Sequence, residues 1–263
     1  MTVDTLVQRM DEQFHPEYQE DYDNSGFLVG NLADEVRSVL VAVDLTESVC
    51  HEAIERGCNM IVTHHPVIFG KVRRITSSTA LGRILLHLLS HGVAVYAAHT
   101  NLDNMQNGVN GILAKQLGLI HCSILKPQGN HPDVGAGMIG ELPSPLSSQQ
   151  FLRQIKVCLH LPAVRVNHTA FQAKPSVSRV AICGGAGSFL IEDARAAGAD
   201  IYLTGDMKYH DFQRGEDIIV ADIGHYESEQ FVRNVLSDTL QAIGDGSFAV
   251  LQATCNDRWD AWI

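Results

Sequence analysis

Apolar positions along the chain alternate between a spacing typical of buried strands and one typical of amphipathic helices. The strand-like runs, rich in β-branched residues, are 36–46, 59–65 and 93–103. The helical segments that follow them are 47–57, 79–92 and 108–118. Strands that alternate with helices in this way predict a largely parallel sheet covered by helices on both faces.

The pattern loosens after residue 125 and then returns. Residues 126–145 are rich in glycine and proline and predict loops with short strands. Regular spacing predicts a helix at 147–161, a strand–turn–helix–strand unit at 178–206, a strand at 217–225 and a long helix at 227–243. The fold class is therefore α/β, with two tandem α/β domains whose central sheets are flanked by helices. We expect the first domain at 1–125, completed by residues 226–263, and the second at 126–225.

Composition narrows the classes of partner. The formal net charge is −11 at pH 7, and the sequence has no stripe of Lys or Arg. Both features argue against duplex nucleic acid as the main partner. No apolar run reaches the roughly 18 residues that a membrane helix needs, and the N-terminus does not resemble a signal peptide. The six cysteines include no CxxC pair, which disfavours a thiolate zinc site. We expect a cytoplasmic protein without a membrane partner.

Histidine and acidic residues stand where the predicted strands end. Ligands of open α/β sheets gather outside the carboxyl ends of the strands. His64 and His65 end one strand, Asp103 follows the next, and His225 lies beyond the last. Imidazole and carboxylate together are ligands of zinc, iron or manganese. The pattern therefore predicts a metal site at this edge.

The spacing of these residues suits two metal ions. Neighbours on a strand point to opposite faces, so His64 and His65 would each serve one of two ions roughly 3.5–4 Å apart. His225 and Glu229 are four residues apart and share a helix face, which favours Glu229 over Glu227 as a ligand. The candidate ligands are His64, His65, Asp103, His225 and Glu229. Five protein ligands would leave open positions, as a catalytic site requires.

Other residues near the predicted edge have supporting roles. Asp206 and His210 are candidates for proton transfer, His99 and Asp44 for orienting the ligand imidazoles, and Asn24 for binding substrate. Glycines at 184–187 favour a tight turn between strand and helix over a phosphate site, because the spacing of a dinucleotide motif is lacking. The tail 254–263 receives no role.

Five ordered motifs also resemble a known family. They are YDNSGFLVG (22–30), VTHHPVIF (62–69), AAHTNLDN (97–104), LTGDMKYHD (203–211) and DIGHYESEQ (222–230). They are similar to the dinuclear-metal proteins named GTP cyclohydrolase 1 type 2 homologues, or the NGG-interacting-factor-three-like family, over about residues 1–250. The resemblance implies two α/β domains, a toroidal homohexamer built as a trimer of dimers, and metal ligands at the five positions above. Tyr22 stands where the family more often has tryptophan, and the insertion that some members carry between the halves is absent.

These observations predict a hydrolase that uses two divalent ions per subunit, with zinc, manganese and iron as alternatives. The expected substrate is a nucleotide or related small molecule, as in GTP ring opening. A metal-binding scaffold or chaperone without turnover is the alternative, and an open coordination position would distinguish the two. A third hypothesis is a partner-binding regulator, which would expose an apolar patch.

Overall fold

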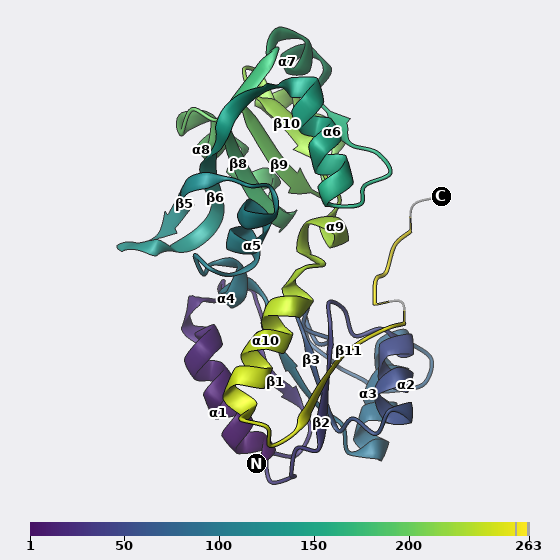
Figure 1. Ribbon diagram of the computed structural model, residues 1–263. Helices are drawn as coiled ribbons and strands as arrows, with labels where there is room; N and C mark the ends of the chain where they lie inside the picture. Colours follow the sequence, from purple (N-terminus) through teal and green to yellow (C-terminus); the bar gives the residue numbers. More distant parts are fainter. Residues whose placement is uncertain (256, 262–263) are drawn as a thin grey trace. The chain divides into compact units, whose positions relative to one another are not determined.

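The structure is a computed structural model that describes residues 1–255 and 257–261. Residues 256, 262 and 263, which belong to the tail 254–263, lie outside the described residues. The chain folds into two compact units, Met1–Leu102 with Val232–Ile263, and Asp103–Phe231. Each unit holds one sheet flanked by helices (Figure 1), which confirms the predicted α/β class.

The first unit is built around a five-stranded sheet in the order β1-β4-β3-β2-β11. Its strands are β1 (Gly26–Val29), β2 (Ser38–Ala42), β3 (Met60–Thr63), β4 (Ala94–Ala97) and β11 (Ala249–Gln252). Only β1 runs antiparallel to its neighbour. The helices are α1 (Val3–Phe14), α2 (Glu47–Glu55), α3 (Ala80–His91) and α10 (Val232–Gly244), with the 3₁₀ turn η1 (Pro16–Tyr18).

The helices of the first unit cover both faces of its sheet. Alternate strand residues such as Leu40, Ile61 and Val95 pack against the apolar sides of α2 and α3. The residues between them point to the other face, where α10 contacts β2 and β3 and α1 contacts α10. Because both faces are buried, β3 and β4 are fully buried runs, and polar side chains are confined to the strand ends.

The second unit is built around a six-stranded mixed sheet in the order β5-β6-β8-β9-β10-β7. Its strands are β5 (Ile120–Gln128), β6 (His131–Ser147), β7 (Arg165–Val166), β8 (Ser176–Ala186), β9 (Ile201–Gly205) and β10 (Ile219–Asp222). The helices are α5 (Val109–Gln116), α6 (Ser148–Cys158), α7 (His168–Ala173), α8 (Ile191–Ala196) and α9 (His225–Glu229), with the 3₁₀ turns η2 (Ser188–Leu190) and η3 (Tyr209–Gly215). The short helix α4 (Thr100–Asp103) lies where the chain passes from one unit to the other.

The boundaries between the two units lie at residues 102/103 and 231/232. The boundaries expected from the sequence were at 125/126 and 225/226. The reason is packing, because α5 contacts β8 and β6, and α9 contacts β8 and β9. The expected single helix at 227–243 is interrupted between α9 and α10. Phe231 packs on the core of the second unit, whereas Val232 opens the helix that covers the first.

The segment 126–145, expected to form loops with short strands, instead belongs to a long hairpin. β5 and β6 pair antiparallel, and β6 continues to pair with β8. Its glycines serve the hairpin: Gly135 has φ +151° and an added Cβ would lie 2.2 Å from the Lys126 carbonyl. No helix among the described residues is long and apolar enough to cross a membrane.

Candidate metal centre

Three histidine rings gather at one end of the first unit's sheet. His64 and His65 directly follow Thr63, the last residue of β3, and their amides both donate to the Val43 carbonyl at 3.1 Å. His99 lies two residues beyond β4. The ring centroids of His64 and His65 are 4.8 Å apart, and that of His99 lies 5.4 and 5.3 Å from them. We call His64, His65 and His99 the histidine cluster.

Each ring of the histidine cluster has its Nδ1 atom hydrogen-bonded to an oxygen. The acceptors are the Ala98 carbonyl for His64, Asp44 for His65 and Asp23 for His99, at 2.7, 2.9 and 2.7 Å. A carbonyl or carboxylate oxygen accepts, so Nδ1 carries the proton and Nε2 carries the lone pair of the neutral ring. Metal-binding imidazoles are held in this way, with one nitrogen fixed by an oxygen and the other presented to the ion.

The carboxylate of Asp23 is built into the first unit and is fully buried. It accepts hydrogen bonds from His99, from the Ser25 hydroxyl at 2.9 Å, and from the amide and hydroxyl of Thr100. Burial alone would raise the pKa of Asp23, but the hydrogen bonds from His99, Thr100 and the Asn24 amide hold that pKa well below its usual range. Asp23 therefore stays ionised and fixes the ring of His99.

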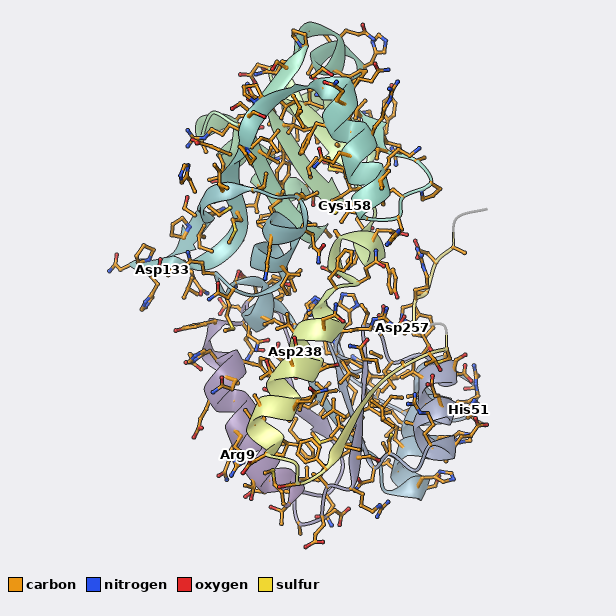
Figure 2. All side chains as sticks on the ribbon, in the orientation of Figure 1. Arg9, His51, Asp133, Cys158, Asp238 and Asp257 are labelled. Carbon is orange, nitrogen blue, oxygen red and sulfur yellow. The ribbon has the colours of Figure 1, made fainter. Side chains whose placement is uncertain are left out.

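The C-terminal segment contributes to the same end of the sheet. Asp257, labelled in Figure 2, is buried and accepts a hydrogen bond from the Val43 amide at 2.9 Å. Trp259 Nε1 donates to Asp44 Oδ1 at 3.1 Å. The described part of the tail, given no role from the sequence, therefore helps to position the carboxylate that holds His65.

In the second unit, His225 and Glu229 face each other on α9, as their spacing predicted. His225 Nε2 lies 3.1 Å from Glu229 Oε2, and His225 Nδ1 donates to Asp206 Oδ2 at 2.8 Å. Glu229 is buried, and Asp206 is exposed directly after β9. Burial alone would lower the pKa of His225, but the Glu229 and Asp206 carboxylates raise it to about 11. A divalent cation at Nε2 would take the place of that proton.

The glycine-rich segment 184–187 makes room for the Glu229 carboxylate. Gly185 has φ +61°, and an added Cβ would lie 2.3 Å from Glu229 Oε1 and 3.2 Å from His225 Nε2. The Gly185 amide donates to the Ser228 hydroxyl at 3.0 Å, and its carbonyl accepts from Thr204 Oγ1 at 3.0 Å. Residues 184–186 form the irregular end of β8 instead of the tight turn favoured from the sequence, and the buried carboxylate leaves no room for a side chain at position 185.

Asp103 lies in the same part of the second unit. Burial holds the pKa of the Cys183 thiol well above its usual range, and the Asp103 and Glu229 carboxylates raise it further. Asn110 donates to the Asp103 carbonyl at 3.1 Å and accepts from the Gly184 amide at 2.9 Å. We call Asp103, His225 and Glu229 the carboxylate cluster. Asn110 is a buried supporting residue that sequence reasoning missed.

Two predicted residues have other surroundings. His210 is exposed on η3, and its ring packs edge-on against Tyr209 at 5.2 Å. The Asn24 side chain donates to the Ile68 carbonyl at 2.6 Å and so braces the loop after the histidine pair. Neither observation tests the role given to the residue, and both roles remain predictions.

The donor chemistry of the two clusters fits a divalent metal. His64, His65 and Glu229 form a group of side chains that could hold a metal ion. His64 and Glu229 are buried and His65 is half-buried. Neutral imidazoles with fixed tautomers and an ionised carboxylate suit zinc, manganese or iron, so the residues present fit the expected metal.

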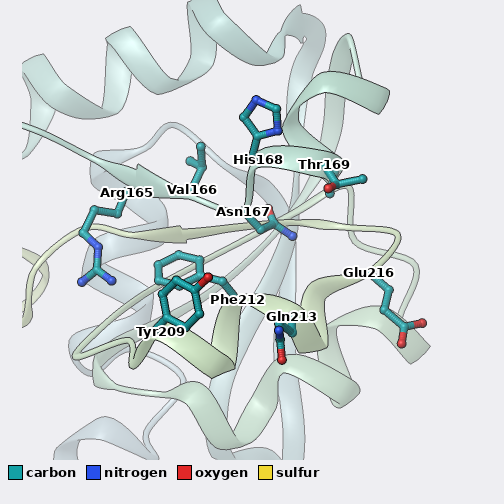
Figure 3. A pocket seen from close by; sticks show the side chains of 10 residues that line it. Arg165, Val166, Asn167, His168, Thr169, Tyr209, Phe212, Gln213 and Glu216 are labelled. Atoms are coloured by element: carbon teal, nitrogen blue, oxygen red, sulfur yellow. The ribbon is translucent and has the colours of Figure 1, made fainter.

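A separate cavity of about 900 Å³ opens in the second unit between the β7–α7 segment and η3 (Figure 3). Arg165, Tyr209 and Phe212 line it, and the Arg165 guanidinium lies 5.0 Å from the centroid of the Phe212 ring. None of the five predicted metal ligands lines this cavity. This cavity is therefore distinct from the predicted metal ligands.

With the fold and both clusters in place, similarity to known proteins identifies the family. The family described as Duf34/NIF3 (NGG1p interacting factor 3) matches residues 1–257. The chain belongs to the Duf34/NIF3 family. A Streptococcus pneumoniae relative named GTP cyclohydrolase 1 type 2 homolog is 33% identical over 238 residues, which cover 89% of each chain. A Clostridium acetobutylicum relative of the same name is 34% identical over 223 residues, which cover 83% of this chain and 82% of the relative.

A solved structure of a similar chain agrees with the fold. A hypothetical protein of Staphylococcus aureus is 30% identical, with a TM-score of 0.92 over 100% of this chain and 99% of its own. The resemblance inferred from the five motifs is therefore confirmed at the level of the family.

Proposed function

We propose that this Duf34/NIF3 protein is a hydrolase that depends on two divalent metal ions. Its metal centre would take ligands from the histidine cluster and the carboxylate cluster, namely His64, His65, Asp103, His225 and Glu229. The observation that carries the proposal is the fixed state of the candidate imidazoles: His64, His65 and His225 each donate Nδ1–H to an oxygen and so present Nε2.

The residues at the proposed centre would have different roles. When bound, divalent ions would supply the hydrolytic chemistry, because they lower the pKa of water toward neutrality. Glu229 would serve as a carboxylate ligand, while Asp44 and Asp206 hold the rings of His65 and His225. His99, fixed by Asp23, adds a further imidazole beside the histidine pair. Asp206 and His210 stay our candidates for proton transfer to the leaving group.

The substrate and the assembly belong to the same proposal. Relatives named GTP cyclohydrolase 1 type 2 homolog support a nucleotide or related small molecule as substrate. The family resemblance supports a toroidal homohexamer, a trimer of dimers, in which the centres face an internal cavity. Light scattering during gel filtration would then give six times the 28.8 kDa mass of the chain, and a monomer or dimer would contradict this assembly.

Metal analysis joined to a turnover screen tests the proposal. Wild-type protein should bind close to two ions per chain and hydrolyse a nucleotide only without chelator. His65→Ala should lose most of that metal and turnover, whereas His87→Ala, which changes an exposed histidine on α3, should keep both. His65→Ala protein that keeps full metal content and rate would refute the assignment.

A metal-binding scaffold without turnover is the second candidate. Burial favours it, because His64 is fully buried and Glu229 is 3% exposed, as in a closed site that stores an ion. The scaffold predicts the same metal content, the same loss in His65→Ala, and no hydrolysis of any nucleotide tested. The chelator-sensitive rate therefore separates the two candidates.

A further inference from the structure

Two exposed aromatic rings lie next to the histidine cluster. Tyr22 is 64% exposed and Phe69 is 53% exposed, and their ring centroids are 6.4 Å apart. The Phe69 ring also packs edge-on against His99, with centroids 6.0 Å apart. Large apolar side chains left together in water beside a buried polar cluster are typical of a binding surface.

The exposure of Phe69 is fixed by the residues before it. Val67 and Ile68 pack against the core of the first unit, and the Asn24 amide donates to the Ile68 carbonyl at 2.6 Å. Thr63 Oγ1 donates to the His65 carbonyl at 2.7 Å at the start of the same loop. The backbone is thus anchored up to residue 68, and Phe69 is the first side chain held outside the core.

Three cations follow Phe69 within five residues. Lys71, Arg73 and Arg74 are all exposed, in a chain with 19 basic and 30 acidic residues. Within residues 1–255 and 257–261 none of the three forms an ion pair, whereas Arg83 pairs with Glu47 at 2.6 Å. A run of unneutralised cations in an acidic protein creates a local field that attracts anions.

We propose that one surface of the first unit binds a small phosphate ester that carries a planar ring. We call it the ring–anion surface, and it consists of Tyr22, Phe69, Lys71, Arg73 and Arg74. Aromatic side chains stack on planar rings whatever their substituents, and the neighbouring cations neutralise the phosphate. The contact between Phe69 and His99 places the ring of such a ligand beside the histidine cluster. The inference rests on the proposed function only for the reaction that follows binding.

Binding measured in the presence of chelator tests the surface apart from the metal centre. The probes are guanosine 5′-monophosphate and its two parts, guanosine and ribose 5-phosphate, titrated by calorimetry. Phe69→Leu and Tyr22→Leu keep apolar bulk and remove the ring, so each should weaken the monophosphate and guanosine about tenfold. Ribose 5-phosphate should bind these variants as it binds wild type. Phe189→Leu changes a ring that is 51% exposed in the second unit and should alter nothing.

The role of Lys71, Arg73 and Arg74 is tested by the binding of the two probes that carry a phosphate. The triple variant Lys71→Gln, Arg73→Gln and Arg74→Gln should weaken the monophosphate and ribose 5-phosphate at least tenfold and leave guanosine unchanged. It should also reduce the dependence of monophosphate affinity on salt. The control pair Lys115→Gln and Arg153→Gln removes exposed cations of the second unit and should match wild type.

Four results would overturn the inference. They are wild-type protein that binds none of the probes, ring variants indistinguishable from Phe189→Leu, a change of oligomeric state in Phe69→Leu, and a single-stranded oligonucleotide that binds more tightly than the monophosphate. The third result would assign the surface to a second copy of the chain, and the fourth to a polymer. Failure of the proposed hydrolase is separate, because it leaves binding in chelator intact.

Discussion

At the scale of single residues, acidic side chains that hold imidazoles recur throughout the candidate centre. Asp44, Asp206 and Asp23 accept from the Nδ1 atoms of His65, His225 and His99 at 2.9, 2.8 and 2.7 Å. Each pair fixes the tautomer and limits rotation of the ring. The same chemistry therefore appears in both units, which is the reason to consider the two clusters together.

Gly185 gives the sharpest residue-scale prediction. Gly185→Ala adds a Cβ 2.3 Å from Glu229 Oε1 at a φ of +61°, so the carboxylate must move. Gly198→Ala is the matched control, because Gly198 has φ +73° and open space around it. Both substitutions should cost about 1–2 kcal/mol of stability from backbone strain. Only Gly185→Ala should lower bound zinc, by more than half in elemental analysis after dialysis. Equal zinc in both variants would show that Glu229 is no ligand.

The sequence predicts the site residues that end strands, and it does not predict those that support them. His64, His65 and His225 could be found because β-branched runs mark the strands that they follow. Asp23 meets His99 across 76 residues and Asn110 meets Gly184 across 74, and no local pattern records such hydrogen bonds. The pairing of a supporting carboxylate with its ring becomes visible only in three dimensions.

At the scale of elements, the C-terminal segment is tied to α2 by one buried carboxylate. Glu52 accepts hydrogen bonds from the Thr254 amide and hydroxyl, at 3.0 and 2.8 Å, and from the Cys255 amide at 2.9 Å. Arg56 pairs with it at 2.6 Å. Burial alone would raise the pKa of Glu52, but the bonds from Cys255 and Thr254 hold it well below its usual range.

Removing the charge of Glu52 should therefore destabilise the first unit in a pH-dependent way. Glu52→Gln should cost about 2 kcal/mol at pH 7, because bonds to a charged acceptor are lost. A lowered folded pKa means that this stability is present above the unfolded value of about 4.3 and is lost as pH falls toward the folded pKa. The difference from wild type in urea unfolding, followed by circular dichroism, should shrink below about pH 4.

The neighbouring Glu55 provides the control for this element. Glu55 lies on the same helix and is exposed, so Glu55→Gln should change stability by less than 0.5 kcal/mol or so at either pH. A Glu52→Gln difference that stays constant down to pH 3 would contradict the account, because the effect would then not depend on ionisation.

The elements that the sequence predicts well are those whose pattern is local. β2, β3 and β4 follow from short β-branched runs, and both faces are buried as such runs require. Residues 126–145 were expected to form loops with short strands, because glycines and prolines mask the long strand β6, which also pairs with the more distant β8. The break between α9 and α10 was also missed, since Phe231 and Val232 fit one helical stripe but pack in different units.

At the scale of the whole molecule, the candidate ligands are divided between the two units. His64 and His65 belong to the first unit, and Asp103, His225 and Glu229 belong to the second. A centre that takes ligands from both clusters would depend on residues of both units. If the centre used only one cluster, metal binding would not change the stability of the other unit.

The thermal response to metal distinguishes a shared centre from separate ones. An ion at about 100 times its dissociation constant stabilises the protein by about 2.7 kcal/mol, so zinc should raise the melting temperature of wild type by a few degrees. With a shared centre, His65→Ala and Glu229→Ala should each abolish most of this rise, and the double variant should lose no more than either alone. His87→Ala should keep the full rise. If the losses from His65→Ala and Glu229→Ala instead add, each unit binds its own ion, and the shared hydrolytic centre is wrong.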